Sequence, residues 1–316
     1  MGTLRLIFFG TAELARATLG GLTRDPTLKV CAVVSQPDKP KGRNLKLQPT
    51  PVKAEAMRLG LPVLQPVKAR APDFIQELAA LQPDLIVVAA YGQILPQSIL
   101  DLPHFGSLNV HASLLPKYRG AAPIQWAILE DEQETGVTIM KMDAGLDTGE
   151  ILTQQSTPIL PIDDAQTLHD RLAELGAKLL LETIPGYIEG GIKPHKQAED
   201  GVSYARKITK EDGRLDWTQP ARVLWNRVRA FTPWPGAFTF VSGETKPPLL
   251  KIWRAEVAQE LAGPFGEIVQ ADKNGIVVAS GRHALRIFEL QREGGKRLHA
   301  REFLAGHCLK AGQRFQ

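Results

Sequence analysis

The sequence predicts an α/β protein with a doubly wound, Rossmann-like N-terminal domain on a mostly parallel sheet, followed by a small C-terminal OB-like β-barrel domain. Length is the first observation, because 316 residues exceed what one hydrophobic core usually organises. The second is a regular alternation of strands and helices in the N-terminal part. The third is the loss of this alternation beyond Arg206, where short strands and turns prevail.

The first domain is predicted from short apolar runs that are each followed by helix-compatible spacing. An apolar run over residues 4–9 ends at Gly10, and residues 12–20 then have helical periodicity. Further strands are predicted at residues 28–35, 61–65, 84–90, 108–110, 136–141 and 150–154, and further helices at residues 73–81, 96–100 and 167–188. Because the strands are rich in Val and Ile and alternate with helices, we expect a parallel sheet covered on both faces.

The chain divides after the long predicted helix. Residues 190–201 are polar and rich in glycine, which is typical of a linker. We therefore predict a catalytic domain over residues 1–189, a linker over 190–205 and a β-barrel domain over 206–316. Short strands are predicted in the last domain at residues 251–257, 266–270, 275–279 and 285–290. Small OB-like barrels often bind nucleic acid.

Charge is distributed unevenly along the chain. Residues 1–204 carry 19 Lys and Arg against 23 Asp and Glu, whereas residues 205–316 carry 19 against 11. The two parts therefore differ in net charge, −4 against +8. A chance excess on a solvated surface is one interpretation, since basic domains without nucleic-acid partners are common. The sequence favours the other interpretation, a C-terminal platform for a polyanion.

Cysteine content and hydropathy indicate a protein of a reducing compartment. The two cysteines are Cys31, inside an apolar run, and Cys308 near the end, and neither is placed as a disulfide partner. No apolar run approaches the roughly 20 residues that span a bilayer, and the first residues lack a signal-peptide pattern. We expect a cytoplasmic protein with no membrane partner.

Several common catalytic motifs are missing from the sequence. There is no G-x-G-x-x-G after the first strand, which disfavours a nicotinamide oxidoreductase. There is also no serine nucleophile elbow, no phosphate-binding G-x-x-x-x-G-K-[ST] and no His or Cys cluster with metal-ligand spacing, so no metal is predicted. Direct attack on an activated carbonyl is then the simplest reaction type.

A polar pair stands at the end of a predicted strand. Asn109 and His111 are two residues apart and point to the same side of the sheet. An amide can stabilise an oxyanion and an imidazole can relay a proton, which together suit acyl transfer. By spacing alone, the pair also fits a strand-capping asparagine and a structural histidine. Asp147, in a glycine-containing acidic loop, is placed to orient the histidine, although Asp is common in loops for structural reasons.

Three segments closely resemble the signature of the formyltransferase family. They are residues 109–116 (Asn-Val-His-Ala-Ser-Leu-Leu-Pro), 118–124 (Tyr-Arg-Gly-Ala-Ala-Pro-Ile) and 142–149 (Met-Asp-Ala-Gly-Leu-Asp-Thr-Gly). In that family the Asn, the His and the second Asp of the acidic loop are catalytic, which implies catalytic roles for Asn109, His111 and Asp147. The donor implied by the resemblance is 10-formyltetrahydrofolate.

The same resemblance implies a set of folate-binding residues. The Ser-Leu-Leu-Pro segment is similar to a tetrahydrofolate-binding stretch, and residues 91–96 (Tyr-Gly-Gln-Ile-Leu-Pro) are similar to the strand-end segment that lines the pterin pocket. With one acid of the acidic loop, the implied set is Tyr91, Gly92, Gln93, Ile94, Ser113, Leu114, Leu115, Pro116 and Asp143.

The branch of the family that acts on methionyl-tRNA is the one that the chain resembles over nearly its whole length. Residues 36–43 resemble the inserted basic loop of that branch, and residues 229–235 with 290–291 resemble its C-terminal domain. The implied partner is initiator methionyl-tRNA. One departure is that Ala12 and Leu14 stand where the family usually has Pro and Phe, which puts in doubt the role of this helix start in holding the methionine side chain.

The basic stretch from residue 36 to residue 48 is predicted to be a mobile surface loop. It has no apolar periodicity, is bounded by prolines and carries one acid, Asp38. A solvated linker is the alternative interpretation. Its cations, which we expect to contact tRNA, are Lys39, Lys41, Arg43 and Lys46.

Two rival functions remain open from the sequence. A formyltransferase that acts on a small amine, such as glycinamide ribonucleotide or an amino sugar, would use the same three catalytic residues. It would need neither the basic loop nor the basic C-terminal domain. A non-catalytic RNA-binding protein on this scaffold is the other rival, and the intact Asn, His and Asp argue against it. We expect a monomer.

Overall fold

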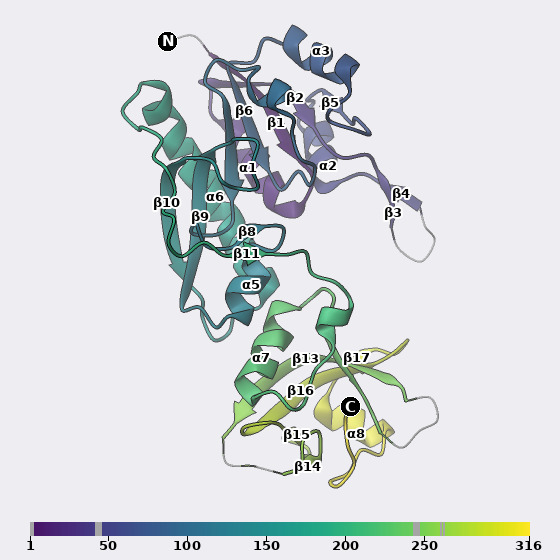
Figure 1. The fold of residues 1–316 in the computed structure, drawn as a ribbon. Coiled ribbons are helices and arrows are strands. Elements are labelled where there is room, and N and C mark those ends of the chain that lie inside the picture. The colour runs from purple at the N-terminus through teal and green to yellow at the C-terminus, as the bar shows by residue number, and fades with distance from the viewer. Residues whose placement is uncertain (1–2, 42–45, 243–246, 260, 262) are drawn as a thin grey trace. The chain divides into compact units, whose positions relative to one another are not determined.

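The computed structural model describes residues 3–41, 46–242, 247–259, 261 and 263–316. The chain forms two compact units (Figure 1). The first comprises residues 1–123, 134–158 and 169–206, and the second comprises residues 124–133, 159–168 and 207–316. The second unit thus includes two short segments that the sequence analysis placed in the N-terminal domain.

The first unit is built on a seven-stranded sheet in the order β10-β9-β7-β6-β1-β2-β5. Strands β5, β2, β1, β6 and β7 are parallel, and β9 and β10 add antiparallel strands beside β7. Their bounds are β1 Leu4–Gly10, β2 Leu28–Val34, β5 Val63–Leu64, β6 Leu85–Ala89, β7 Ser107–His111, β9 Glu134–Lys141 and β10 Ile151–Pro158. The predicted mostly parallel sheet is confirmed, because every predicted strand of this part is present.

Helices alternate with these strands as the apolar periodicity predicts. Their bounds are α1 Glu13–Arg24, α2 Pro51–Arg58, α3 Pro72–Ala80, α4 Gln97–Leu100, α5 Pro123–Leu129 and α6 Ala165–Ile188. Residues 124–129 of α5 and residues 165–168 of α6 fall in the second unit. Helix α2 was not predicted, although its start has a clear signal. The Thr50 hydroxyl accepts a hydrogen bond from the backbone N–H of Lys53 at 3.1 Å, and Pro51 occupies the first helical position.

Apolar residues of the central strands make the core of the first unit. Strand β6 is buried at all five positions, and the last five residues of β1 are buried as well. Ile7, Phe9 and Val88 pack in one cluster with residues of α3, including Phe74 and Leu78. Burial on both faces explains why these strands have continuous apolar runs instead of alternation.

The second unit contains an antiparallel sheet in the order β12-β13-β16-β15-β14, with β17 paired to β16. The strands are β12 Ala237–Phe240, β13 Leu249–Ala258, β14 Ile268–Asp272, β15 Gly275–Ala279, β16 Ala284–Arg292 and β17 Arg297–His299. Helices α7 Ala221–Ala230 and α8 Ala300–Gly306 and a 3₁₀ turn at Glu211–Gly213 complete it. The predicted β domain is therefore present as an antiparallel sheet, and its closure into a barrel stays a prediction.

Two pairs of short strands lie outside the large sheets. Strands β3 (Lys39–Lys41) and β4 (Lys46–Gln48) form an antiparallel hairpin within the stretch predicted to be a loop. Strands β8 (Arg119–Gly120) and β11 (Tyr204–Ala205) pair in parallel. The β8–β11 pair joins the signature segment to the end of the predicted linker. Across the described part of the chain, no helix combines the length and the apolar character needed to cross a membrane.

Candidate active site

Strand β7 carries the first two predicted catalytic side chains. Asn109 pairs with Val88 of β6 and with Met140 of β9, so it lies inside the sheet with a strand on each side. His111 ends the strand, and both side chains are buried, with 9% and 6% of their surface exposed. Two polar residues in a fully buried strand need hydrogen-bond partners, and these come from segments outside the sheet.

The His111 ring is fixed by one hydrogen bond to the main chain. Its Nε2 lies 3.0 Å from the carbonyl oxygen of Tyr118. A carbonyl oxygen only accepts, so Nε2 carries a proton and donates it. The other ring nitrogen, Nδ1, faces the Oδ2 atom of Asp147 at 3.7 Å. This assigns Nδ1 as the nitrogen that is free to exchange a proton with a ligand.

Asp147 lies in the loop between β9 and β10 and meets both residues. Its backbone is in the left-handed region, with φ at 52°. Its Oδ2 accepts a hydrogen bond from the backbone N–H of Gly120 at 2.8 Å, and its Oδ1 lies 3.5 Å from Nδ2 of Asn109. The structure therefore brings Asn109, His111 and Asp147 together, although Asp147 is 36 residues beyond His111.

The contacts within this group are long. A strong hydrogen bond to a carboxylate usually measures about 2.7–2.9 Å, and both Asn109 and His111 lie well beyond that from Asp147. Only the main-chain bond from Gly120 is short. The amide and the imidazole are thus positioned without being consumed by internal bonds, which leaves them able to interact with a reacting group.

The residues predicted from the pterin-pocket segment differ widely in exposure. Tyr91 is 2% exposed, and its ring packs edge-on against Phe9 at 5.2 Å between centroids. The Gln93 side chain accepts from the backbone N–H of Ala69 and donates to the carbonyl of Val67. Gly92 is exposed with φ at 83°, and Ile94 is 84% exposed. Only Gly92 and Ile94 offer open surface.

The segment predicted as a tetrahydrofolate-binding stretch is largely internal. Ser113 is fully buried, and its hydroxyl donates to the carbonyl of Lys117 at 2.6 Å. Leu115 is 3% exposed and its backbone N–H donates to the hydroxyl of Thr138. Leu114 and Pro116 are partly exposed. The polar contacts of this segment thus serve the scaffold that carries His111.

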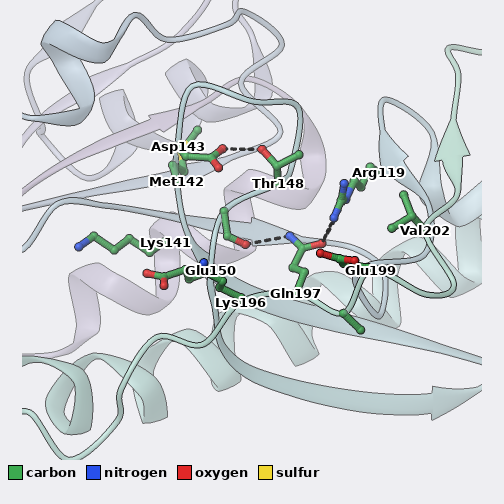
Figure 2. Close-up of a pocket in the computed structure, with 12 residues that line it drawn as sticks. Arg119, Lys141, Met142, Asp143, Thr148, Glu150, Lys196, Gln197, Glu199 and Val202 are labelled. Atoms are coloured by element: carbon green, nitrogen blue, oxygen red, sulfur yellow. Dashed lines mark hydrogen bonds between the residues drawn. The ribbon is translucent and has the colours of Figure 1, made fainter.

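A pocket of about 660 Å³ adjoins the acidic loop within the first unit (Figure 2). Asp143 is exposed there, and its Oδ1 accepts from the Thr148 hydroxyl at 2.7 Å and from the backbone N–H of Gly145 at 3.0 Å. The lining includes Thr148 and Gly149 but not Asn109, His111 or Asp147. Within the described residues, no group of three or more His, Cys, Asp or Glu side chains is arranged to hold a metal ion.

The predicted tRNA-binding cations belong to the β3–β4 hairpin. Lys39 and Lys41 lie in β3 and Lys46 begins β4, whereas Arg43 lies outside the described residues. The side chain of Lys39 is exposed and donates to Gln36 at 3.3 Å. The base of the hairpin is attached to the first unit, because the acid that precedes β3 accepts hydrogen bonds from two side chains outside the hairpin.

That acid is Asp38. Its Oδ2 accepts from Lys53 at 2.7 Å, and its Oδ1 accepts from Gln65 at 2.8 Å. These hydrogen bonds, first that of Lys53 and then that of Gln65, lower the pKa of the Asp38 carboxyl below its ordinary value. Because Lys53 neutralises Asp38, this carboxylate does not offset the charge of the hairpin lysines.

Sequence reasoning missed three groups that hold the site. They are the carbonyl of Tyr118 on His111, the backbone N–H of Gly120 on Asp147, and the side chain of Gln197 on the acidic loop. The first two lie in the Tyr-Arg-Gly segment, which was recognised as part of the signature without a role. Gln197 lies in a polar, glycine-rich stretch, and nothing in the sequence marks it.

The family models match both parts of the chain. Residues 4–184 match the formyl transferase model, and residues 207–308 match the model for the formyl transferase C-terminal domain. The chain belongs to the formyl transferase family.

The relatives narrow this to one branch. The chain is 51% identical over 314 residues to the methionyl-tRNA formyltransferase of Geobacter sulfurreducens, covering 99% of this chain and 97% of the relative. It is 49% identical over 311 residues to that of Caldanaerobacter subterraneus, covering 98% and 99% of the two chains. At this identity over nearly full length, the chain falls within the methionyl-tRNA formyltransferases.

Solved structures of lower identity share the fold. The sugar 3N-formyltransferase WlaRD, crystallised with dTDP and 5-N-formyl-tetrahydrofolate, has a TM-score of 0.64 at 20% identity, covering 92% of this chain and 98% of its own. HypX from Aquifex aeolicus in complex with tetrahydrofolic acid has a TM-score of 0.62 at 20% identity, covering 99% of this chain and 51% of its own. These likenesses support the fold alone.

Proposed function

We propose that Asn109, His111 and Asp147 carry the transfer of the formyl group of 10-formyltetrahydrofolate to the α-amino group of initiator methionyl-tRNA. The observation that supports this assignment is their meeting at the end of β7, where the buried amide of Asn109 and the buried imidazole of His111 face the partly exposed carboxylate of Asp147 across long contacts. Membership of the formyl transferase family supplies the reaction class.

The reaction is an acyl transfer by direct attack. The methionyl amine nitrogen forms a bond to the formyl carbon, and the bond from that carbon to the folate nitrogen breaks. Negative charge develops on the formyl oxygen in between, the amine loses a proton, and the folate nitrogen gains one. A free α-amine titrates near pH 7.7–8.0, so a substantial neutral fraction is present at neutral pH. The protein therefore needs to stabilise an oxyanion and to relay one proton.

Each of the three side chains takes one of these tasks. Asn109 donates from Nδ2 to the oxyanion, because this N–H₂ is held only loosely by Asp147 at 3.5 Å. His111 relays a proton through Nδ1, since Nε2 is bonded to the carbonyl of Tyr118, and once Nδ1 carries that proton it donates to the oxyanion. Asp147 stabilises the charged form of the imidazole and orders water. No covalent enzyme intermediate is needed.

The folate is proposed to lie against the exposed members of the two predicted folate segments. The exposed or partly exposed members are Gly92, Ile94, Leu114 and Pro116. Asp143 offers its Oδ2 atom to the folate, because its Oδ1 already accepts two hydrogen bonds. Tyr91, Gln93, Ser113 and Leu115 are proposed to shape this surface from below, because their side chains are buried or engaged with the main chain.

The tRNA is proposed to contact the β3–β4 hairpin through Lys39, Lys41, Arg43 and Lys46. The Asp38–Lys53 pair supports this, because it leaves the hairpin strongly basic. Arg43→Ala is expected to lower kcat/KM for methionyl-tRNA by at least about tenfold, while the KM for the folate changes by less than about twofold. Lys29→Ala, at an exposed position of β2, is the matched control. Equal activity of both variants would assign tRNA selection to another surface.

The basic excess of residues 205–316 supports a second tRNA-binding surface. The affinity of the full chain for tRNA is then expected to fall steeply with salt, because each neutralised phosphate releases counterions. Fluorescence anisotropy at 50 and 200 mM salt measures this directly. A flat salt response would contradict a phosphate-binding platform.

The assay that tests the whole proposal follows a labelled formyl group. The protein is incubated with labelled 10-formyltetrahydrofolate and with charged initiator tRNA, charged elongator tRNA, glycinamide ribonucleotide or a nucleotide-linked amino sugar. Label is expected on methionyl initiator tRNA at the highest rate. Label on a small amine alone would identify the rival enzyme class, and no label on any acceptor would contradict the enzyme proposal.

Compartment, oligomeric state and domain bounds belong to the same proposal. Translation initiation takes place in the cytoplasm, and we expect the protein there. All three proposed catalytic residues come from one chain and one compact unit, so a monomer suffices. Light scattering in solution measures the mass, with 34.6 kDa expected. Limited proteolysis within residues 190–205, with stable fragments on either side, tests the predicted bounds.

A further inference from the structure

Gln197 lies in the segment between α6 and β11 and reaches the acidic loop with its side chain. Its amide Nε2 donates to the carbonyl of Asp147 at 2.7 Å and to the carbonyl of Gly149 at 2.8 Å. Both amide protons are thereby used on the main chain of the loop that presents Asp147. Gln197 lines the pocket, and Figure 2 shows its side chain among the other lining residues.

Arg119 holds the other end of the same amide. Its Nε and Nη2 both donate to Oε1 of Gln197, at 3.1 and 2.7 Å (Figure 2). Arg119 is only 9% exposed, so this forked contact lies in a largely desolvated setting. The carboxamide of Gln197 therefore has all its hydrogen-bonding groups occupied, which leaves it no free donor for a substrate.

The segment that carries Gln197 is attached to the first unit on both sides. His195 and Ile151 exchange two backbone hydrogen bonds of 3.0 and 2.8 Å. On the other side, the carbonyl of Ser203 accepts from the N–H of Arg119 at 2.9 Å, and the carbonyl of Ala205 accepts from the N–H of Ala121 at 2.8 Å. The backbone on which Gln197 stands is thus fixed before and after it.

Asp147 is held from two directions, and both begin at β8. Gly120 of β8 donates its N–H to the carboxylate of Asp147, and Arg119 of β8 orients Gln197, which holds the carbonyl of Asp147. The loop needs such support, because residues 143–146 are exposed and Asp147 has a left-handed backbone. Without Gln197, the carbonyls of Asp147 and Gly149 lose this donor, and the bond from Gly120 is the one short contact that still holds the Asp147 carboxylate.

We propose that Gln197 is a positioning residue for Asp147, so that the stretch predicted to be a linker is a working part of the active site. This inference rests on the proposed role of Asp147. Gln197 fixes where the carboxylate stands relative to His111 Nδ1, and it touches neither substrate. Its loss is therefore expected to lower kcat, with little effect on the KM of either substrate.

Two substitutions separate positioning from simple attachment of the segment. Gln197→Glu keeps the contact with Arg119 and strengthens it with a charge, but it places a carboxylate against the two loop carbonyls. Gln197→Met keeps the length of the side chain and removes both contacts. We expect kcat to fall about 10- to 100-fold in both variants, with each KM within about threefold, since a misplacement near 1 Å can cost about 100-fold. Gln155→Ala, at an exposed position of β10, is the matched control.

Thermal unfolding shows whether a loss of kcat in either variant comes from a loss of stability. Because Gln197→Glu retains the link to Arg119, it is expected to melt within a few degrees of the parent even if Gln197→Met does not. If Gln197→Glu has parental kcat while Gln197→Met does not, only the attachment to Arg119 matters and the proposal is wrong. Near-parental kcat in both variants would overturn it as well.

A cycle with Asp147→Asn separates this inference from the function on which it rests. If Gln197 acts through Asp147, adding Gln197→Glu to Asp147→Asn is expected to lower kcat by less than about threefold, well short of its effect in the parent. Full multiplication of the two losses would show that Gln197 acts by another route. If Asp147→Asn alone keeps parental kcat, the proposed catalytic role of Asp147 is wrong and the inference about Gln197 fails with it.

Discussion

Two buried polar clusters, one in each unit, differ in how tightly their groups are bonded. Around Asp147 in the first unit, the contacts to Asn109 and His111 measure 3.5 and 3.7 Å. Around Arg229 of α7 in the second unit, Nη2 donates to Asn226 at 2.7 Å and Nη1 donates to two backbone carbonyls, those of Leu160 and Asp163, at 3.2 Å each. Arg229 is as buried as Asn109, with 9% of each residue exposed, but its side chain makes a shorter hydrogen bond than Asn109 makes to Asp147.

The Arg229 cluster is closed on further sides. Its guanidinium stacks over Trp225, 3.7 Å from the ring centroid, and Arg222 beside it makes a forked contact with Asp131 at 2.8–3.0 Å. Burial lowers the pKa of Arg229 to about 10, with Arg222 adding to this and Asp131 and Asp163 opposing it. At neutral pH the group stays charged, and its charge is met by carbonyls and by the π face of the indole.

The difference separates a polar cluster that stabilises the fold from one that is proposed to react. The two terminal guanidinium nitrogens of Arg229 are bonded within the cluster, and its Nε has no hydrogen-bond partner among the described residues. Donors that are bonded in this way cannot follow a charge that develops during a reaction, whereas loosely held donors can. Arg229 binds helix α7 to residues 160 and 163 within its unit, and this fixes structure. Asn109 and His111 are oriented by strand β7 and by one main-chain bond, and the contacts of their Nδ2 and Nδ1 atoms to Asp147 are long, as the proposed role requires.

The largest expected effect is on turnover in the Asp147 cluster. Asn109→Ala and His111→Ala are each expected to lower kcat about 100- to 1,000-fold, because an oxyanion donor acts mainly in the transition state. Each KM and the melting temperature are expected to change little. Steady-state kinetics with both substrates varied, together with thermal unfolding, provide the measurement. A raised KM at unchanged kcat would show that the side chain binds substrate instead of stabilising the transition state.

Arg229 is expected to show the opposite pattern. Arg229→Met keeps the aliphatic stem but leaves the carbonyls of Leu160 and Asp163 and the Asn226 side chain without this donor, which is expected to cost about 1–3 kcal/mol in the free energy of unfolding. Activity per folded molecule is expected to stay within about threefold. Urea unfolding of this variant, beside Arg301→Met at an exposed position of α8, measures the difference. Parental stability with reduced kcat would break the contrast between the two clusters.

Sequence reasoning predicted what depends on local pattern and on recognised motifs. Strands β1, β2 and β6 follow from continuous apolar runs. The two-residue spacing of Asn109 and His111 predicted that both point to one side of β7, although spacing alone also fitted structural roles for them. Helices α2, α5, α7 and α8 and the β3–β4 hairpin were missed. In α7 the polar residues Asn226 and Arg229 interrupt the buried face of the helix, and the hairpin has only three residues per strand.

Long-range polar contacts could not be predicted from the sequence. Gln197 follows Asp147 by 50 residues and meets it because its segment is held by the bridge between His195 and Ile151 and by the β8–β11 pair, which has two residues per strand. Such a short pairing has no periodicity to detect. The partner of His111 is a backbone carbonyl, that of Tyr118, and any residue type can supply one. The resemblance supplied the identity of the proposed catalytic residues, and the structure supplied their supports.

The smallest expected effect on activity and stability is that of removing the Tyr91 hydroxyl. This hydroxyl is buried and has no hydrogen-bond partner among the described residues, so it belongs to neither kind of cluster. The backbone carbonyl of Tyr91, by contrast, accepts from the side chains of Thr11 and Gln36 at 2.8 Å each. A lone buried hydroxyl is neither a closed cluster nor a donor held for a ligand. Tyr91→Phe is therefore expected to leave kcat and the folate KM within about twofold and to leave the melting temperature at neutral pH equal or slightly raised.

The difference in melting temperature between Tyr91→Phe and the parent is expected to depend on pH. Burial raises the pKa of Tyr91 to about 12 from its ordinary 10.0, so between these values the unfolded chain releases a proton that the folded chain retains. The contribution of Tyr91 to stability is complete below pH 10 and is lost as the pH rises toward 12. Phenylalanine has no such loss, so the melting temperature of Tyr91→Phe is expected to exceed that of the parent by more at pH 10.5 than at pH 7.5.

Tyr204→Phe, at a position that is 63% exposed, is the control that separates this from a general loss of stability in alkali. A gap between Tyr91→Phe and the parent that stays constant with pH, or a large loss of folate affinity in this variant, would show that the hydroxyl has a partner and would place Tyr91 with the reactive cluster.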